Sequence, residues 1–326
     1  MNFVLLYSLR LLRKIFHERN DKSPYGWVIR DYCDYCDQNG NDEIYHVLEN
    51  YKGGGLMFSK WGTVEFSQAN SNYVNKINLS LKDCWAIIRG RMGLPYKGIN
   101  YALYNNAGVF PLNKNIQLKF GDKALQDCQL IDVLGSYIRE EKGISSLWSK
   151  ALKVNLDAFY APWMFKNPWT KWLKGKRVLV VHPFVESIES QYKNNRTRLF
   201  EQQDALPEFK ELILVKAVQS QAGEQPPFED WFEALAYMER EIDKHDYDVA
   251  IIGCGAYGMS LAAHVKKQGK VGIHLGGWVQ MLFGVYGERW ISQQTKYAKY
   301  VNKYWIRPND NEQIKRGNSI EGGCYW

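Results

Sequence analysis

The sequence predicts an α/β protein with a Rossmann-like, mostly parallel sheet flanked by helices. Short apolar runs at 178–181, 212–215, 248–252 and 271–275 alternate with segments of helical periodicity at 186–203, 228–244 and 257–268. A glycine-rich turn at 253–258 follows the third run. Alternating strands and helices with short connections form parallel sheets that helices cover on both faces. The ligand crevice of such a sheet lies at the carboxyl ends of the strands.

The first half of the chain is less regular. Its pattern predicts a short strand at 56–59, helices at 42–51, 81–91 and 124–140, and a loop at 105–111. Tryptophans gather among prolines and lysines at 162–176, which indicates a boundary. We therefore expect an N-terminal helix in 1–25, an α/β half in 26–170, a nucleotide-binding half in 171–305 and a polar tail in 306–326. Whether the two halves share one sheet stays open.

Composition excludes several classes of protein. With 45% hydrophobic and 24% charged residues, the chain is typical of a folded globular protein. The net charge of +7 is mild, and no dense basic stripe accompanies it, so we expect no nucleic-acid partner. The cysteine pair Cys33 and Cys36 has no second pair at zinc-site spacing, so reduced thiols and a cytoplasmic location are expected. The 14% of aromatic residues suits either sugar stacking or a large core.

Residues 1–16 predict an amphipathic, basic helix. Leu5, Leu9, Leu12 and Phe16 recur at helical spacing, and basic residues interrupt the apolar run well short of a membrane span. Such a helix either packs on the domain through this stripe or makes peripheral contact with the inner face of the plasma membrane. The packed arrangement is the slightly favoured interpretation.

The first strand of the second half ends at His182. A histidine at the carboxyl end of a strand can donate to a phosphate or act as an acid or base. Gln191 and Arg196 follow on the next helix and are candidate binding residues. The competing interpretation is a buried, satisfied histidine with solvated arginines.

The glycine-rich turn fits G-x-G-x-x-G between a strand and a helix, through Gly253, Gly255 and Gly258, with Tyr257 before the last glycine. Glycines there let a backbone approach a phosphate, and the helix N-terminus supplies free N–H groups. A dinucleotide site also requires an acid at the end of the next strand. No carboxylate stands there, so the pattern predicts a phosphate site without NAD.

The last strand end supplies more candidate binding residues: His274, Gly276, Gly277, Gln280 and Arg289. Paired glycines after a strand permit close approach of a ligand. Arg289 and Trp290 together could neutralise a diphosphate and stack on a base or sugar. The alternative interpretation of these two residues is a buried tryptophan beside a surface ion pair.

In the first half, Glu65 lies just past the strand at 56–59. A carboxylate at this position suits a general base or a metal ligand.

Three stretches of the chain resemble uncharacterised proteins from bacterial surface-polysaccharide gene clusters. They are DVAIIGCGAYGMSLAAHVKKQGKVGIHLGGWVQMLFGVYGERW, VLVVHPFVESIESQ and NNAGVFP. The overall plan is similar to glycosyltransferases of the GT-D type, in which a strand followed by Arg-(Phe/Tyr)-Gly-Asp-Gly-Glu binds the metal and the nucleotide sugar. Here Gly62 and Glu65 match that motif, while Thr63 replaces its aspartate.

The resemblance implies transfer of a sugar from a UDP- or GDP-sugar to a glycan or lipid-linked acceptor, in the synthesis of a polysaccharide such as capsule or O-antigen. Glu65 and His182 would be catalytic, and Gly62 would contact the donor. One carboxylate holds Mg²⁺ or Mn²⁺ poorly, which leaves the metal in doubt with Glu65 as its only candidate ligand.

Two other functions stay open. A glycine-rich turn after a strand also binds S-adenosylmethionine, which makes a methyltransferase the first alternative, although the acid expected after the next strand is again missing. A non-catalytic assembly protein that binds a nucleotide sugar or glycan is the second.

Overall fold

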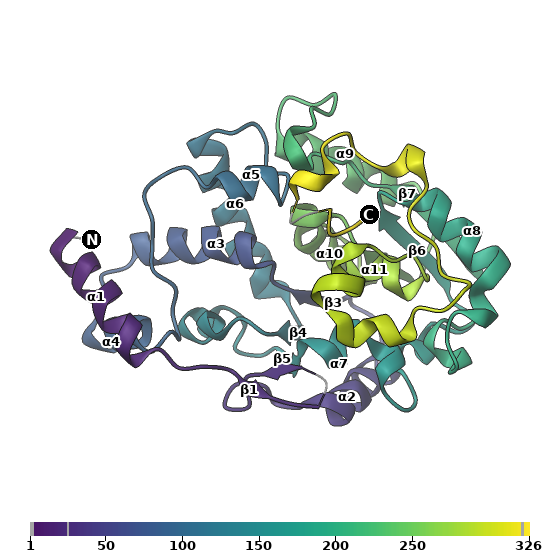
Figure 1. The fold of residues 1–326 in the computed structure, drawn as a ribbon, viewed down its shortest axis with the longest axis horizontal. Helices are drawn as coiled ribbons and strands as arrows, with labels where there is room; N and C mark the ends of the chain where they lie inside the picture. The colour runs from purple at the N-terminus through teal and green to yellow at the C-terminus, as the bar shows by residue number, and fades with distance from the viewer. Residues whose placement is uncertain (1–2, 25, 321–322) are drawn as a thin grey trace.

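A computed structural model describes residues 3–24, 26–320 and 323–326. Seven parallel strands form one sheet in the order β5-β4-β3-β9-β8-β6-β7, with helices on both faces (Figure 1). The predicted Rossmann-like α/β class is confirmed. Strands of the first half and of the second half meet where β3 pairs with β9, so the halves share one sheet. The strands are β3 (Leu56–Lys60), β4 (Val133–Ser136), β5 (Leu152–Asn155), β6 (Arg177–His182), β7 (Glu211–Lys216), β8 (Val249–Ile252) and β9 (Val271–His274).

Two apolar cores cover the two faces of the sheet. Alternate residues of each strand point to opposite faces, so Leu179 and Val181 of β6 join one core and Val178 and Val180 join the other. The first core is covered by α3 (Thr63–Lys76), α6 (Lys114–Asp127), α9 (Trp231–Asp243) and α10 (Gly258–Lys267). The second is covered by α2 (Asp37–Glu49), α7 (Leu156–Tyr160), α8 (Val185–Asn195) and α11 (Trp278–Leu282). Burial on both faces explains why the strands are apolar throughout.

The order of strands across the sheet reverses between the parallel neighbours β6 and β8, because β7 lies on one side of this pair and β9 on the other. From β6 the chain runs through α8 on one face to the edge strand β7, whereas from β8 it runs through α10 on the other face to the central strand β9. The two connecting loops therefore diverge at the carboxyl ends of neighbouring strands. This separation opens a crevice, which is where open α/β sheets bind their ligands.

The predicted helix at 124–140 is wrong. Helix α6 ends at Asp127, and the strand β4 occupies Val133–Ser136 in the middle of the sheet. The apolar residues of this stretch happen to recur at helical spacing, and all four residues of β4 are buried. A short strand buried on both faces gives no period-two signal that would distinguish it from a helix.

Helix α3 was not predicted, because polar side chains form much of its buried face. Gln68 Nε2 donates to Asn72 Oδ1 at 2.8 Å, and Asn72 Nδ2 donates to Asp122 Oδ1 at 2.7 Å on α6. Buried amides need such partners. Their hydrogen bonds join α3 to α6 where apolar residues would mark an ordinary amphipathic helix.

The remaining elements lie around this sheet. They are α1 (Phe3–Phe16), α4 (Leu81–Ile88), α5 (Tyr101–Asn105) and a two-stranded ribbon of β1 (Asp21–Lys22) and β2 (Trp27–Val28). Helices α1 and α4 pack together at one end of the molecule, on the left of Figure 1, and α8 lies at the opposite end. The helix predicted at 186–203 is shorter than expected, because the α-helix stops at Asn195 and a 3-10 turn follows.

Candidate functional site

A pocket opens at the carboxyl edge of the sheet, where β3, β4, β6, β8 and β9 end. It encloses about 990 Å³ of space between protein atoms, part of it open to solvent. Most of the residues that the sequence singles out line it: Gly62, Glu65, His182, Gly253, Gly255, Tyr257, His274, Gly276, Gly277, Gln280 and Arg289. The parallel sheet, whose strands all end at this edge, thus brings residues more than two hundred positions apart to one cavity.

Three candidate residues do not line this pocket. Gln191 is buried on α8, where its Nε2 donates to the carbonyl oxygens of Gly284 at 2.8 Å and Tyr304 at 2.9 Å. Arg196 lies above the ring of Tyr192 and pairs at 3.8 Å with the carboxylate of Glu208. Both side chains stabilise the loops beyond α8 and are turned away from the crevice.

Gly258 is the third candidate that does not line the pocket, and it makes room for the side chain of His274. A Cβ atom at this position would lie 2.3 Å from Cδ2 of His274. Gly253 is similar, since its Cβ would lie 2.5 Å from the carbonyl oxygen of Gly276. Two glycines of the G-x-G-x-x-G turn are therefore required by packing between β8 and β9, whatever ligand the pocket accepts.

Gly255 and Gly276 are required by backbone conformation. Their φ angles are +59° and +63°, in the left-handed region that side chains disfavour. The carbon chain of Lys60 passes close to Gly276, where a Cβ would lie 2.8 Å from Lys60 Cε. Lys60 thereby reaches the pocket across the end of β9.

His182 is buried and neutral. Its Nδ1 accepts a hydrogen bond at 3.0 Å from the backbone N–H of Phe184, so the proton of the neutral ring resides on Nε2. Burial lowers the pKa of His182 to about 3. This geometry makes His182 a hydrogen-bond donor to the pocket, and Nδ1 is already engaged.

His274 is buried in the same way at the end of β9. Its Nδ1 lies 3.0 Å from Oγ of Ser59 on the neighbouring strand β3. Burial, with a smaller contribution from the charge of Lys60, holds the pKa of His274 well below its usual value. Two neutral imidazoles thus flank the crevice.

Glu65 stands in the first turn of α3 and is half-buried. Its carboxylate lies back over Gly62, where a Cβ would approach Glu65 Oε1 to 2.6 Å, so this glycine permits the orientation of the acid. Behind it, burial raises the pKa of the Tyr137 hydroxyl, and the negative charge of Glu65 raises it further. Glu65 is the only carboxylate side chain among the described residues that line the pocket.

Gln280 presents a buried acceptor. Its Nε2 donates to the carbonyl oxygen of Tyr325 at 3.1 Å, which fixes the orientation of the amide. Its Oε1 is buried and has no hydrogen-bond partner within the described part of the chain. An unsatisfied buried acceptor costs about 1–3 kcal/mol, so this oxygen favours binding of a donor such as a water or a ligand hydroxyl.

Arg289 and Trp290 have separate roles. The guanidinium of Arg289 lies 4.8 Å from the ring centroid of Tyr325 and lines the pocket. Trp290 is fully buried and meets Trp278 edge to face at 5.6 Å. The expected stacking of Trp290 on a ligand is wrong, because core packing takes up its whole surface.

The chain end closes one side of the pocket. Tyr325 and Trp326 line it, and the backbone N–H groups of Glu288 and Arg289 donate to the carbonyl oxygens of Trp326 and Cys324. Sequence reasoning missed Tyr325 and Trp326, and also Lys60 and Tyr137. Only Lys60 carried a signal, since it directly follows a predicted strand whose carboxyl end enters the site.

A second carboxylate occupies the start of α8. Buried Glu312 accepts hydrogen bonds from the backbone N–H groups of Glu186 and Ser187 and from the Ser187 hydroxyl. These groups are the free donors at a helix N-terminus that attract anions. Since Glu312 already satisfies them, an anionic ligand of the pocket has to use other donors.

The donors of the site do not form a metal cluster. In residues 3–24, 26–320 and 323–326, no three His, Cys, Asp or Glu side chains gather where they could hold a metal ion. Cys33 and Cys36 are free thiols just before α2. Positive charge in the pocket comes from Lys60 and Arg289.

Comparisons with protein-family models, with curated proteins and with solved structures give no significant match. The resemblance to polysaccharide-cluster proteins and to GT-D enzymes therefore stays a prediction. A functional assignment has to rest on the fold and on the geometry of the pocket.

Proposed function

We propose that the chain is a glycosyltransferase that moves a sugar from a nucleoside-diphosphate donor to a glycan or lipid-linked acceptor in cell-surface polysaccharide synthesis. The observation that carries the proposal is the meeting of Glu65 with Lys60 and Arg289 in one pocket at the carboxyl edge of the sheet. Sugar transfer needs a base near the acceptor hydroxyl and positive charge near the departing diphosphate.

Each group has a role in this reaction. Glu65 takes the proton of the acceptor hydroxyl as that oxygen attacks the anomeric carbon. The bond from the anomeric carbon to the diphosphate breaks, and Lys60 and Arg289 stabilise the charge that develops on the leaving oxygen. The Nε2–H group of His182 donates a hydrogen bond to the same anion, a role that replaces the acid–base role expected from sequence.

Gln280 supports a hydroxyl-rich ligand. Its buried Oε1 lacks a donor in the described structure, and a sugar or ribose hydroxyl would supply one. A single carboxylate binds a divalent cation poorly. Lys60 and Arg289 are therefore the main source of positive charge in the pocket, whether or not Glu65 holds such a cation. We place the reaction in the cytoplasm at the inner face of the plasma membrane, where nucleotide sugars and lipid-linked acceptors meet.

The proposal is tested by ligand-dependent thermal unfolding followed by donor hydrolysis. UDP, GDP and their sugar conjugates should raise the melting temperature, and S-adenosylmethionine should not. Glu65→Gln should keep donor binding and lose hydrolysis of the sugar–diphosphate bond. Stabilisation by S-adenosylmethionine alone would favour the methyltransferase, and nucleotide binding with no hydrolysis by the wild-type chain would favour a binding protein.

A further inference from the structure

Helix α1 exposes an apolar face to solvent. Tyr7, Leu11 and Ile15 are 64%, 52% and 68% exposed, and Val4 continues the same row one turn earlier. Their spacing of three and four residues puts them on one side of the helix. Apolar residues gathered on one exposed face mark an interaction site, whereas scattered ones need no explanation.

This face differs from the stripe expected to pack on the domain. Leu9 is the one member of that stripe that is buried, and Leu5, Leu12 and Phe16 stay exposed. Helix α1 therefore rests on the domain along a narrow line through Leu9. Most of its apolar surface remains on the outside.

A second group of exposed apolar side chains joins the C-terminal end of α1 to α4. The ring of Phe16 lies 6.2 Å from that of Trp85, which is half exposed, and Leu81 is 91% exposed at the start of the same helix. We call the set Tyr7, Leu11, Ile15, Phe16, Leu81 and Trp85 the α1–α4 surface.

Positive charge borders the α1–α4 surface. Arg10 and Lys14 are exposed on α1, and Lys82 is exposed on α4. The sequence of α1, FVLLYSLRLLRKIF, contains no acidic residue. Apolar side chains with a cationic border match the interface of an anionic bilayer, in which apolar groups insert and basic groups meet lipid phosphates.

Helix α1 is fixed in this orientation by polar contacts. Arg13 points inward, where it donates to the carbonyl oxygens of Ile87 at 2.8 Å and Met92 at 2.7 Å and pairs with Glu140 at 2.5 Å. The exposed face is therefore held away from the domain by groups on the opposite side of the helix.

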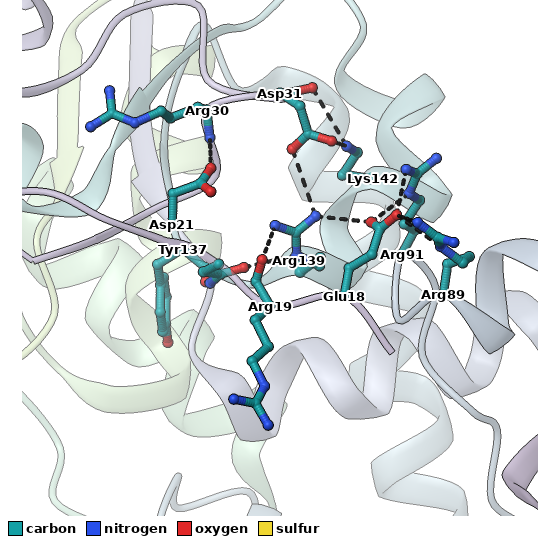
Figure 2. Close-up of polar contacts among 11 residues, drawn as sticks. Glu18, Arg19, Asp21, Arg30, Asp31, Arg89, Arg91, Tyr137, Arg139 and Lys142 are labelled. Atoms are coloured by element: carbon teal, nitrogen blue, oxygen red, sulfur yellow. Dashed lines mark hydrogen bonds and ion pairs between the residues drawn. The ribbon is translucent and has the colours of Figure 1, made fainter. Parts of the chain in front are cut away.

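The segment after α1 is clamped by a cluster of charges. Figure 2 shows the carboxylate of Glu18 between Arg89, Arg91 and Arg139, with contacts of 2.5, 2.7 and 3.0 Å. The hydrogen bond of Arg91, followed by that of Arg89, lowers the pKa of Glu18 to about 2 despite partial burial. Glu18 thus keeps its charge, and the clamp stays closed at neutral pH.

The clamp also connects α1 to the pocket. Arg139 and Glu140 begin the 3-10 helix that follows β4, and Tyr137, which lies between β4 and that helix, lines the pocket. The backbone oxygen of Tyr137 accepts a hydrogen bond at 3.1 Å from Asn20. Helix α1 is therefore attached at the carboxyl edge of the sheet, the edge at which the pocket opens.

We propose that the α1–α4 surface docks the protein on an anionic phospholipid bilayer, with α1 lying in the plane of the interface. A helix of 14 residues is too short to span the hydrocarbon core. No helix in the described part of the chain is long and apolar enough to cross a membrane. Docking by one face leaves the sheet and its pocket on the water side.

The test is co-sedimentation of the full chain with vesicles of phosphatidylcholine alone or mixed equally with phosphatidylglycerol. The wild-type chain should bind the mixed vesicles and should not bind those of phosphatidylcholine alone. Leu11→Ser with Ile15→Ser should weaken binding about tenfold or more. Arg10→Gln with Lys14→Gln should weaken binding to the mixed vesicles by about tenfold, because it removes the attraction to the anionic lipid.

A matched control changes exposed apolar residues elsewhere. Ile99 is 52% and Leu112 is 42% exposed, far along the chain from α1, and replacing both by serine should leave vesicle binding unchanged. Thermal unfolding of each variant verifies that the fold is kept. Donor binding by the Leu11→Ser, Ile15→Ser variant should equal that of wild type, so the result is separate from the proposed chemistry.

Two results would overturn the proposal. One is a wild-type chain that stays in solution with anionic vesicles. The other is a wild-type dimer that the same two serine substitutions convert to a monomer, which would show that a second copy of the chain covers this surface.

Discussion

The Nδ1 atom of His182 accepts a hydrogen bond from the backbone N–H of Phe184, two residues along the chain. This contact sets the tautomer of the ring and fixes the ring to the backbone that follows β6. Burial keeps the ring neutral, and its Nε2–H group is left for a ligand.

The neutral state of His182 predicts loss of stability in acid. Its folded pKa of about 3 lies below the ordinary value of 6.5, so its contribution is complete above pH 6.5 and is lost as pH falls towards 3. Between these pH values the unfolded chain binds one more proton than the folded chain. The free energy of unfolding therefore falls by about 1.4 kcal/mol for each unit by which the pH is lowered. The variant His182→Asn keeps an acceptor for Phe184 and cannot titrate. Its denaturant midpoint should therefore fall less steeply than that of wild type between neutral and mildly acidic pH, and equal slopes would contradict the assignment.

Gly258→Ala should destabilise the protein. The added methyl would lie 2.3 Å from His274, whose ring is held between Ser59 and α10. Overpacking of this kind costs about 1–3 kcal/mol. Gly98→Ala is the matched control, because no atom lies within 4 Å of the new Cβ, and urea unfolding should show a change of about 0.5 kcal/mol or less. Equal stability of the two variants would show that the His274 ring at the end of β9 moves to accommodate the methyl group.

Glu18→Gln should loosen the attachment of α1. Loss of the charge leaves three arginines around a neutral amide, with an expected cost of about 1–3 kcal/mol. Because the folded pKa of Glu18 is about 2, the wild-type advantage should be full above pH 4.5 and decline as pH falls towards 2. Hydrogen exchange of α1 amides should rise in the variant at neutral pH, and unchanged exchange would mean that Arg13 alone holds the helix.

Glu65→Gln should reduce sugar transfer by about 10²–10⁴-fold, as loss of a general base does. The amide is isosteric with the acid and fits over Gly62, so donor affinity should stay near that of wild type. Turnover and donor affinity measured on the same samples separate the two effects. Transfer at the wild-type rate would remove Glu65 from the chemistry.

The second half of the chain was predicted well because its strands are short apolar runs bounded by turns. The positions of β6, β7, β8 and β9 all follow from this pattern. In the first half, the strand predicted at 56–59 and the helix predicted at 81–91 match β3 and α4. Strand β4 and helix α3 were missed, because β4 lies in a stretch with helical spacing and α3 buries amides such as Gln68. Those elements are set by tertiary packing that local periodicity does not report.

The candidate site was predicted from the rule that parallel α/β sheets bind ligands at the carboxyl ends of their strands. The prediction failed for residues that do not face the pocket. Glu65, His182 and Arg289 converge as expected, while Gln191 and Gly258 serve internal packing. Tyr325 and Trp326 could not be found, since only the folding back of the chain end brings them to the pocket. Contacts between residues so distant in sequence leave no local pattern.

The central claim is that the pocket holds a nucleoside diphosphate with its charge near Lys60 and Arg289. Titration calorimetry of UDP and GDP against wild-type protein and Lys60→Met tests it most directly. We expect binding of at least one of the two to wild type and a loss of about tenfold or more in affinity for Lys60→Met, since a charged hydrogen bond contributes about 1.5–3 kcal/mol. Absence of binding to wild type, or equal affinity in the folded variant, would contradict it.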